Sequence, residues 1–134
     1  MKHDDEKNRS RVLVIDPDAE SQRAYLEYFQ GTAFALSGCE GVAEAVERLG
    51  REHYDCILMD VVLPEMRGYE AVRYVQKKDP DTPIILTASE NSKTLESRVR
   101  QENIFYYYIK SFNSDELMMA VQSATRKIRN EKAE

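Results

Sequence analysis

Short apolar runs alternate along this chain with longer stretches in which apolar residues recur every three or four positions. Residues 12–15 are four apolar residues, three of them β-branched, a run typical of a strand buried on both faces. Residues 19–29 follow with the rough spacing of an amphipathic helix. The pattern then repeats to the end of the chain and predicts five strand–helix units.

Four further strands and four further helices are predicted from the same two periods. The stretch 92–101 is the thinnest helix, because Leu95 and Val99 are its few apolar anchors. The last helix is predicted to start with Asn113 as N-cap, with Glu116 three residues later. Strict alternation favours an α/β fold, a doubly wound (βα)5 arrangement around a five-stranded parallel sheet. The other strands are expected at residues 33–36, 56–59, 84–87 and 104–109, and the other helices at residues 41–49 and 68–78.

Length and charge narrow the possible functions. The 134 residues suit one domain, predicted at residues 10–130 between a disordered leader at 1–9 and a tail at 131–134. The net charge of −5 argues against a nucleic-acid surface, which needs clustered Lys and Arg. No apolar run reaches the roughly 18 residues of a membrane span, and the polar N-terminus lacks a signal-peptide core. We therefore expect a cytoplasmic protein that binds neither nucleic acid nor membrane.

Chemically useful side chains stand where the predicted strands end. Asp16, Asp60, Thr87 and Lys110 each follow or close an apolar run. In sheets of this kind ligands bind at the carboxyl ends of the strands, so these four side chains are expected to meet at one edge. Two nearby carboxylates attract a hard dication, and a hydroxyl and an ammonium beside them suit a phosphoryl group.

Four stretches carry a resemblance to a known family: VLVID, DCILMDVVLPEMRGYEAV, PIILTAS and YYYIKSF. Through them, residues 11–130 resemble the receiver domain of two-component response regulators, which has a flavodoxin-like fold. The third-strand motif, D-x-x-L-x-D-x-x-L-P-x-M-x-G, is the most specific of these stretches. The resemblance implies a signalling module and not an enzyme, apart from Mg²⁺-dependent self-phosphorylation and autodephosphorylation.

The resemblance also implies a phosphoacceptor and a metal site. Asp60 matches the acid that takes a phosphoryl group from a histidine kinase or a phosphotransfer protein. Asp16, Asp60 and the backbone carbonyl of Val62 match the ligands of Mg²⁺. Phosphoryl transfer depends mainly on positioning and charge neutralisation, which these groups can supply.

Three further residues match positions of the family's switch. Lys110 would pair with Asp60 and then with the phosphoryl oxygens, and Thr87 would move toward the phosphoryl group and bond it. The ring of Tyr107 would change its packing with that movement. A structural alternative stays open for Tyr107, because alternate aromatics in residues 106–108 also fill both faces of a strand.

The turn after the first strand departs from the family pattern. Receivers usually carry two consecutive acids where this chain has Asp16 and Pro17, and the second acid is normally a Mg²⁺ ligand. Proline suits the first turn of a helix but cannot bind a metal through its side chain, so Mg²⁺ binding is expected to be weakened. Asp18 could replace the lost acid, or could simply favour the helix N-terminus.

Three other positions also depart from the pattern. Ser111 replaces the proline, usually preceded by a cis bond, that follows the lysine in the family. A cis bond before a residue other than proline costs roughly 2.5–4 kcal/mol, so the sequence leaves open a trans bond that could re-aim Lys110. Arg67 stands where an Asp or Asn is common. The spacing leaves either Thr87 or Ala88 at the hydroxyl position, and the LTAS string favours Thr87.

These departures leave three functions to compare. The first is a phosphorylatable receiver, and the second is a degenerate receiver that binds a partner without phosphorylation. A small flavodoxin-like enzyme or nucleotide binder is the third, but it would need a Gly- or Ser/Thr-rich loop where this chain has the acidic DPDAES. The resemblance implies a downstream protein or output domain as partner, and a homodimer could form through the fourth helix, fifth strand and fifth helix.

Overall fold

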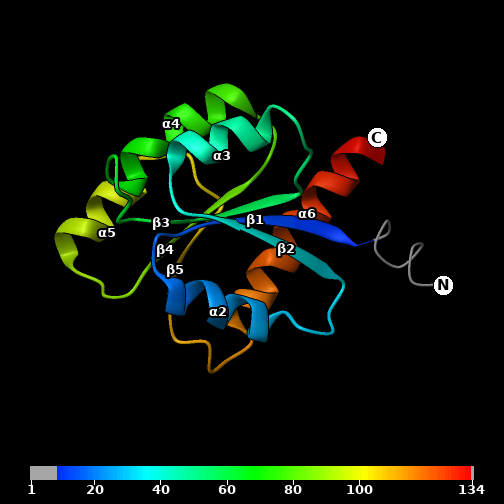
Figure 1. Cartoon of the computed structure of the whole chain (residues 1–134), viewed down its shortest axis with the longest axis horizontal. Helices are drawn as coiled ribbons and strands as arrows, with labels where there is room; N and C mark the ends of the chain where they lie inside the picture. The colour runs from blue at the N-terminus through cyan, green and yellow to red at the C-terminus, as the bar shows by residue number, and fades with distance from the viewer. Residues whose placement is uncertain (1–8, 134) are drawn as a thin grey trace.

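The computed structural model describes residues 9–133, with side chains described for residues 9–126. Five parallel strands form one sheet in the order β2-β1-β3-β4-β5 (Figure 1). The predicted α/β fold with a five-stranded parallel sheet is therefore confirmed. Of the predicted leader, only Arg9 falls within the described residues, and the backbone of residues 131–133 continues the last helix. The strands are β1 (Ser10–Ile15), β2 (Phe34–Cys39), β3 (Cys56–Asp60), β4 (Ile84–Ala88) and β5 (Tyr106–Ile109).

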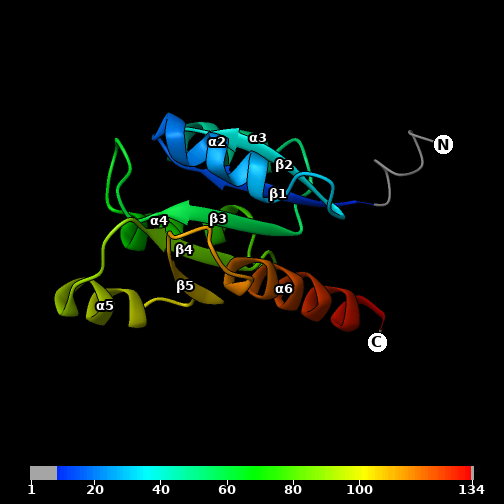
Figure 2. The ribbon, with the colours of Figure 1, turned by 90° about the horizontal axis from the view of Figure 1, so that it is seen from below.

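Helices cover both faces of the sheet, as a doubly wound fold requires (Figures 1 and 2). Side chains of α3, α4 and α5 pack into the core on one face, and those of α2 and α6 pack into the core on the other. No helix within residues 9–133 is long and apolar enough to cross a membrane. The helices are α2 (Ala19–Tyr28), α3 (Val42–Leu49), α4 (Gly68–Lys78), α5 (Lys93–Arg100) and α6 (Glu116–Ala133).

The central strands are apolar on both sides because each side faces a helical layer. In β3, Ile57 and Met59 join the core under α3 and α4, whereas Cys56 and Leu58 join the core over α2 and α6. This period of two explains why the sequence shows continuous apolar runs without polar alternation. Burial raises the pKa of the Cys56 thiol to about 12, so this cysteine acts as a small apolar core residue.

The start of the last helix is the main error of the sequence-based assignment. The helix begins at Glu116, not after Asn113, and the N–H of Met119 donates to the carbonyl of Asp115. The Glu116 carboxylate accepts a hydrogen bond from the Tyr106 hydroxyl at 2.6 Å and does not reach back to cap the helix. The segment before the helix is instead fixed by contacts with α2, which the local sequence does not reveal.

The helix predicted to be thinly anchored is α5. Val99 is its one buried residue, and Leu95 is half-buried against the same core. Ser92 caps the helix by accepting the N–H of Leu95 at 3.1 Å. Few apolar contacts therefore hold α5 against the sheet, compared with four buried residues in α4.

Candidate functional site

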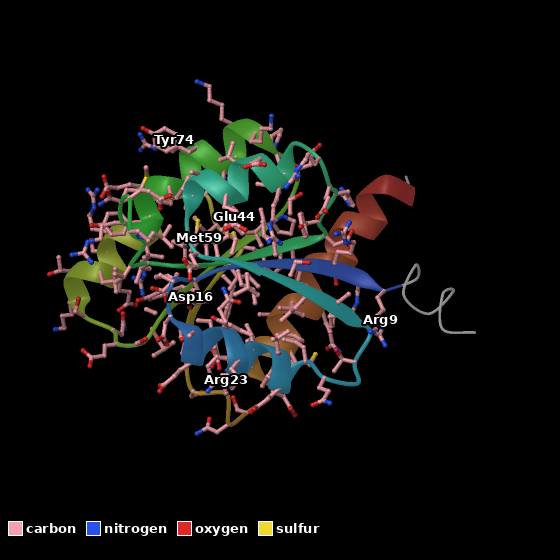
Figure 3. The ribbon with its side chains drawn as sticks, in the orientation of Figure 1. Arg9, Asp16, Arg23, Glu44, Met59 and Tyr74 are labelled. Atoms are coloured by element: carbon pink, nitrogen blue, oxygen red, sulfur yellow. The ribbon has the colours of Figure 1, made fainter. Side chains whose placement is uncertain are left out.

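The period of the strands places four polar side chains on one side of the sheet. Asp16, Asp60, Thr87 and Lys110 each lie two residues beyond a strand residue that packs against α2 and α6. Alternate residues of a strand share a face, so all four point toward the α2 side at the carboxyl edge. Asp16 is labelled in Figure 3, where β1 ends and the chain turns toward α2.

Lys110 lies between the two carboxylates. Its Nζ is 2.6 Å from Oδ2 of Asp16 and 2.7 Å from Oδ1 of Asp60, and it is 3.0 Å from the hydroxyl of Ser21. All three charged side chains are less than one tenth exposed. One ammonium therefore compensates two buried carboxylates, and such a group is held firmly in place because an unpaired charge would be costly here.

Burial and pairing act in opposite directions on these groups. Burial raises the pKa of Asp16, and the hydrogen bond from Lys110 offsets only part of that effect. Burial alone would lower the pKa of Lys110, but its hydrogen bonds to Asp16 and Asp60 outweigh it and raise that pKa. The lysine therefore stays charged at neutral pH and holds positive charge beside Asp60.

The Asp60 carboxylate is oriented by the main chain as well as by Lys110. Oδ2 accepts the N–H of Val62 at 2.8 Å, and the Thr87 hydroxyl lies 3.4 Å from Oδ1. Asp60 and Thr87 are register partners of β3 and β4. Ala88 instead packs into the core under α3 and α4, so Thr87 is the residue that brings a hydroxyl to Asp60.

The first residue of α4, Gly68, lies against the backbone of Asp60 and Val61. A Cβ built on Gly68 would lie 2.2 Å from the carbonyl oxygen of Asp60 and 2.8 Å from the Cα of Val61. The N–H of Gly68 also donates to the Val61 carbonyl at 2.8 Å. The start of α4 therefore packs directly on the backbone that carries Asp60, at a distance that only glycine allows.

Of the two roles left open for Asp18, the structure shows the one at the helix N-terminus. The Asp18 carboxylate accepts both the N–H of Ser21 at 3.0 Å and its hydroxyl at 2.8 Å, so it caps α2. These bonds from Ser21 lower the pKa of Asp18. The N–H of Asp18 donates to Oδ1 of Asp16, which leaves Asp16 as the buried acid of this turn.

Two residues of α2 that contact the site were not predicted from the sequence. The hydroxyl of Ser21 contacts Lys110 across 89 positions of the chain, and the side-chain amide of Gln22 donates to the carbonyls of Asp16 and Cys39. Gln22 thereby fixes the end of β1 that carries Asp16. A polar residue on the inner side of the first helix was the available signal, but it does not identify a partner so distant in sequence.

Lys110 reaches Asp60 although the residue after it is not proline. All peptide bonds within the described residues are trans, including the one between Lys110 and Ser111. The N–H of Lys110 donates to the Ala88 carbonyl at 2.8 Å, which continues the strand pairing as far as the lysine. The bond is therefore trans, the cheaper of the two states left open by the sequence, and Lys110 nevertheless contacts Asp60 at 2.7 Å.

Two tyrosines lie close to the four side chains. The Tyr107 ring packs on the α3–α5 side of the sheet, and its hydroxyl donates to Oδ1 of Asn91 at 3.0 Å, just before α5. Tyr25 of α2 lies on the opposite side, where its hydroxyl is buried and interacts with the Thr87 hydroxyl. Burial raises the pKa of Tyr25 and the charges of the two site carboxylates add to that effect, whereas the interaction between the two hydroxyls lowers that pKa.

A cavity of about 600 Å³ opens beside the Asp60 carboxylate. Asp16, Asp60 and Lys110 lie in its wall, and Arg67 and Arg98 line the same cavity. The Arg98 guanidinium lies 4.9 Å from the centre of the Tyr69 ring, which links α5 to α4 at the outer wall. The cavity therefore presents both carboxylates and cations to a small anionic group.

The carboxylates present fit a Mg²⁺ ion that arrives together with phosphate. Asp16 and Asp60 share one ammonium, and among the side chains of residues 9–126 no three His, Cys, Asp or Glu form a metal-sized group. Proteins hold Mg²⁺ through one or two carboxylates, with waters and substrate phosphate completing the shell. Two carboxylates thus meet the minimum for such a site, without the third acid that would make a resident metal centre.

Known proteins are similar to this chain over most of its length. Residues 12–122 match the family model of the response regulator receiver domain. The transcriptional regulatory protein ResD of Bacillus subtilis is 26% identical over 123 residues, which cover 92% of this chain and 51% of ResD. The regulatory protein AtoC of Escherichia coli is 36% identical over 121 residues, 86% of this chain and 25% of AtoC. The chain therefore spans about half of one relative and a quarter of the other.

Solved structures of receiver domains share the fold. The receiver domain of an HD domain-containing protein from Pseudomonas fluorescens superposes with a TM-score of 0.86 at 20% identity, covering 94% of this chain and 93% of that chain. The response regulator TrrA from Thermotoga maritima, in complex with Mg²⁺-BeF, gives a TM-score of 0.74 at 26% identity, covering 86% of this chain and 98% of TrrA.

Proposed function

Since this chain belongs to the response regulator receiver domain family, we propose that it is a working phosphoacceptor of a two-component system. Asp60 takes a phosphoryl group from a histidine kinase or a phosphotransfer protein. The observation that carries this proposal is the Lys110 ammonium, held 2.7 Å from the Asp60 carboxylate at the wall of an open cavity. A lysine in this position compensates the charge of the acceptor and can then bind the phosphoryl oxygens.

In the transfer step, a carboxylate oxygen of Asp60 forms a bond to phosphorus. The bond from phosphorus to the imidazole nitrogen of the donor breaks, and that nitrogen keeps the electron pair. Lys110 neutralises one phosphoryl oxygen, and Thr87 donates its hydroxyl to another. Asp16, Asp60 and the backbone carbonyl of Val62 would hold Mg²⁺, which supplies positive charge against the phosphoryl oxygens when it is bound.

The proposed switch couples a movement of Thr87 at the site to the packing of Tyr107 and of α5. Thr87 and Tyr107 lie on opposite sides of the sheet, but β4 and β5 are paired at Leu86 and Tyr107. A movement of Thr87 toward the phosphoryl group can therefore reach Tyr107 through the paired strands and change its contact with Asn91. The helix beyond Asn91 is α5, which Val99 alone anchors by full burial. A weakly anchored helix changes position for a small free energy, so the α5–β5–α6 face is the proposed surface for a downstream protein, an output domain or a second copy.

This proposal describes a cytoplasmic signalling module without enzymatic turnover of a separate substrate. Self-phosphorylation from a donor and autodephosphorylation are its only reactions. Residues 10–130 form the receiver unit in this proposal, and signal output belongs to the partner that reads the surface. Direct binding of nucleic acid or membrane is not part of it.

A degenerate, partner-binding receiver is the second candidate, and the turn after β1 favours it. Pro17 supplies no ligand, and the Asp18 carboxylate is already engaged by Ser21. The metal site therefore lacks an acid that receivers usually have. In this alternative the same α5–β5–α6 face would bind its partner without a phosphoryl group.

The test incubates the protein with acetyl phosphate and MgCl₂ and measures its intact mass, with Asp60→Asn as the matched control. We expect an adduct of one phosphoryl group on the wild-type chain that is absent with EDTA and absent in the variant. Because hydrolysis can outrun detection, beryllofluoride with Mg²⁺ is titrated in parallel as a stable phosphoryl mimic. Absence of both the adduct and beryllofluoride binding would replace the phosphoacceptor by the degenerate receiver.

A further inference from the structure

The loop that follows Lys110 has an unusual backbone. Phe112 has φ of 59°, the one non-glycine residue with positive φ within residues 9–133. Bulky side chains rarely adopt this left-handed conformation, and they keep it only where the surroundings determine it. Contacts from β5 and from α2 surround this residue in the structure.

Tyr108 supplies the contacts from β5. Its phenol oxygen accepts the N–H of Ser111 at 3.2 Å and the N–H of Phe112 at 2.8 Å. The Tyr108 side chain is fully buried, and it starts from β5 only two residues before Lys110. The two hydrogen bonds therefore close the loop back onto the strand that carries the lysine.

The aromatic ring of Phe112 makes the contacts with α2. It packs edge-to-face on Tyr25, with ring centroids 5.0 Å apart, and on Tyr28 at 5.9 Å. The Tyr28 hydroxyl donates to the carbonyl of Ser114 at 2.7 Å and accepts the N–H of Met118 at 3.1 Å. The loop is thus attached to α2 on one side and to β5 on the other.

We infer that Tyr108 is a positioning residue for Lys110, because its hydroxyl fixes the backbone that follows the lysine. This inference rests on the proposed function. The backbone of Lys110 is fixed from before by its N–H bond to the Ala88 carbonyl at 2.8 Å. The Tyr108 hydroxyl fixes the two peptide units that come after it. Held from both sides, the lysine side chain is directed to Asp16 and Asp60.

The experiment compares Tyr108→Phe with Tyr106→Phe, a matched control on the same strand. The Tyr106 hydroxyl donates to the Glu116 carboxylate of α6 at the surface, whereas the Tyr108 hydroxyl accepts N–H groups of the loop after Lys110. In Tyr108→Phe we expect amide hydrogen exchange to accelerate at Ser111 and Phe112, because their acceptor is gone. We also expect about tenfold weaker binding of beryllofluoride with Mg²⁺, as the net value of one to two hydrogen bonds implies. Tyr106→Phe should change neither quantity.

The outcomes separate this inference from the proposed function. If wild-type protein binds beryllofluoride and Tyr108→Phe binds it equally well, Tyr108 has only a structural role and the inference is wrong. If the wild-type protein does not bind beryllofluoride at all, the proposed function fails first and the inference fails with it. Should Tyr108→Phe not fold, Phe112→Ala loosens the same loop from the α2 side. It must weaken beryllofluoride binding by a similar factor, and an unchanged affinity would overturn the inference.

Discussion

The two halves of the site are held by different parts of the chain. Backbone contacts position Asp60: Val62 donates its N–H to the carboxylate, and Gly68 packs on the Asp60 carbonyl. Around Asp16 and Lys110, side chains decide the geometry. Ser21 and Tyr108 hold Lys110 and its loop, and Gln22 holds the end of β1.

This difference explains where the sequence keeps the receiver pattern and where it departs. The segment from Asp60 to Gly68 keeps the D-x-x-L-P-x-M-x-G part of the pattern, with Arg67 as its departure. Backbone packing leaves few alternative residues at Gly68. The departures at Pro17 and Ser111 lie in the half where side chains do the holding. There the Tyr108 hydroxyl fixes the loop after Lys110. The position of a lysine can thus survive the loss of its usual neighbour.

The largest effect is expected from Lys110→Met, which removes the ammonium that Asp16 and Asp60 share. Two buried carboxylates would then face each other without compensation, and breaking a buried ion pair costs about 3–5 kcal/mol. We expect a loss in this range in the free energy of unfolding at pH 7, measured by urea denaturation. A loss below about 1 kcal/mol would mean that solvent already screens the two acids.

The pH dependence of the same variant sharpens this prediction. The folded state raises the pKa of Lys110 above its ordinary value, since hydrogen bonds to Asp16 and Asp60 outweigh burial. The stability from this proton is complete below the unfolded pKa and is lost as the pH rises through the folded pKa. The wild-type advantage over Lys110→Met should therefore be full at pH 7 and decline in strongly alkaline solution. A constant difference across that range would contradict the ion-pair interpretation.

Gly68→Ala tests the main-chain half. The added Cβ would lie 2.2 Å from the Asp60 carbonyl oxygen, so the start of α4 must move away. Forced overpacking of this kind costs about 1–3 kcal/mol, and we expect about 2 kcal/mol in urea denaturation. Gly50→Ala is the matched control, because its nearest neighbour is the flexible end of Lys78. Equal losses in the two variants would show that Gly68 has no special role.

Pro17→Asp restores the acid that the pattern lacks and should leave the fold intact. A further carboxylate at the cavity wall is expected to raise Mg²⁺ affinity about tenfold, measured by isothermal titration. Asp18→Asn is the control at the neighbouring position. Because the Asp18 carboxylate caps α2 through Ser21, we expect that variant to leave Mg²⁺ affinity unchanged. A loss of Mg²⁺ affinity in Asp18→Asn would instead identify Asp18 as the ligand that compensates for Pro17.

The smallest effect is expected from Glu65→Gln, a side-chain contact within the main-chain half. The Glu65 carboxylate accepts the N–H groups of Val42 and Ala43 at 3.1 Å and so caps α3 from the loop after β3. These bonds lower the pKa of Glu65, so its contribution is present above the ordinary pKa and lost as the pH falls. We expect a loss below about 1 kcal/mol at pH 7 and none in strong acid, measured by thermal unfolding. A pH-independent loss would point to packing in place of charge.

The strands and helices could be predicted because each depends on the spacing of apolar residues within a short stretch of sequence. Apolar runs and helical stripes gave the sheet, and parallel pairing of the strands brings Asp16, Asp60 and Lys110 to one edge. Contacts between distant elements were missed, because no local pattern records them. Ser21 meets Lys110 across 89 positions, and the start of α6 is displaced since Tyr28 holds the chain before it. Thr87 was chosen over Ala88 by its surrounding string, and the register with Asp60 agrees with that choice.

Tyr25 gives the chain a built-in optical reporter. The protein has eight tyrosines and no tryptophan, so its ultraviolet emission comes from phenol groups alone. One of these phenols, that of Tyr25, is buried beside the site, where Thr87, Asp16 and Asp60 all influence its hydroxyl. Quantum yield and near-ultraviolet dichroism of a phenol depend on its hydrogen bonding and on nearby charge. Addition of a phosphoryl mimic can therefore be followed by spectroscopy on the unlabelled protein, with Tyr25→Phe as the blank.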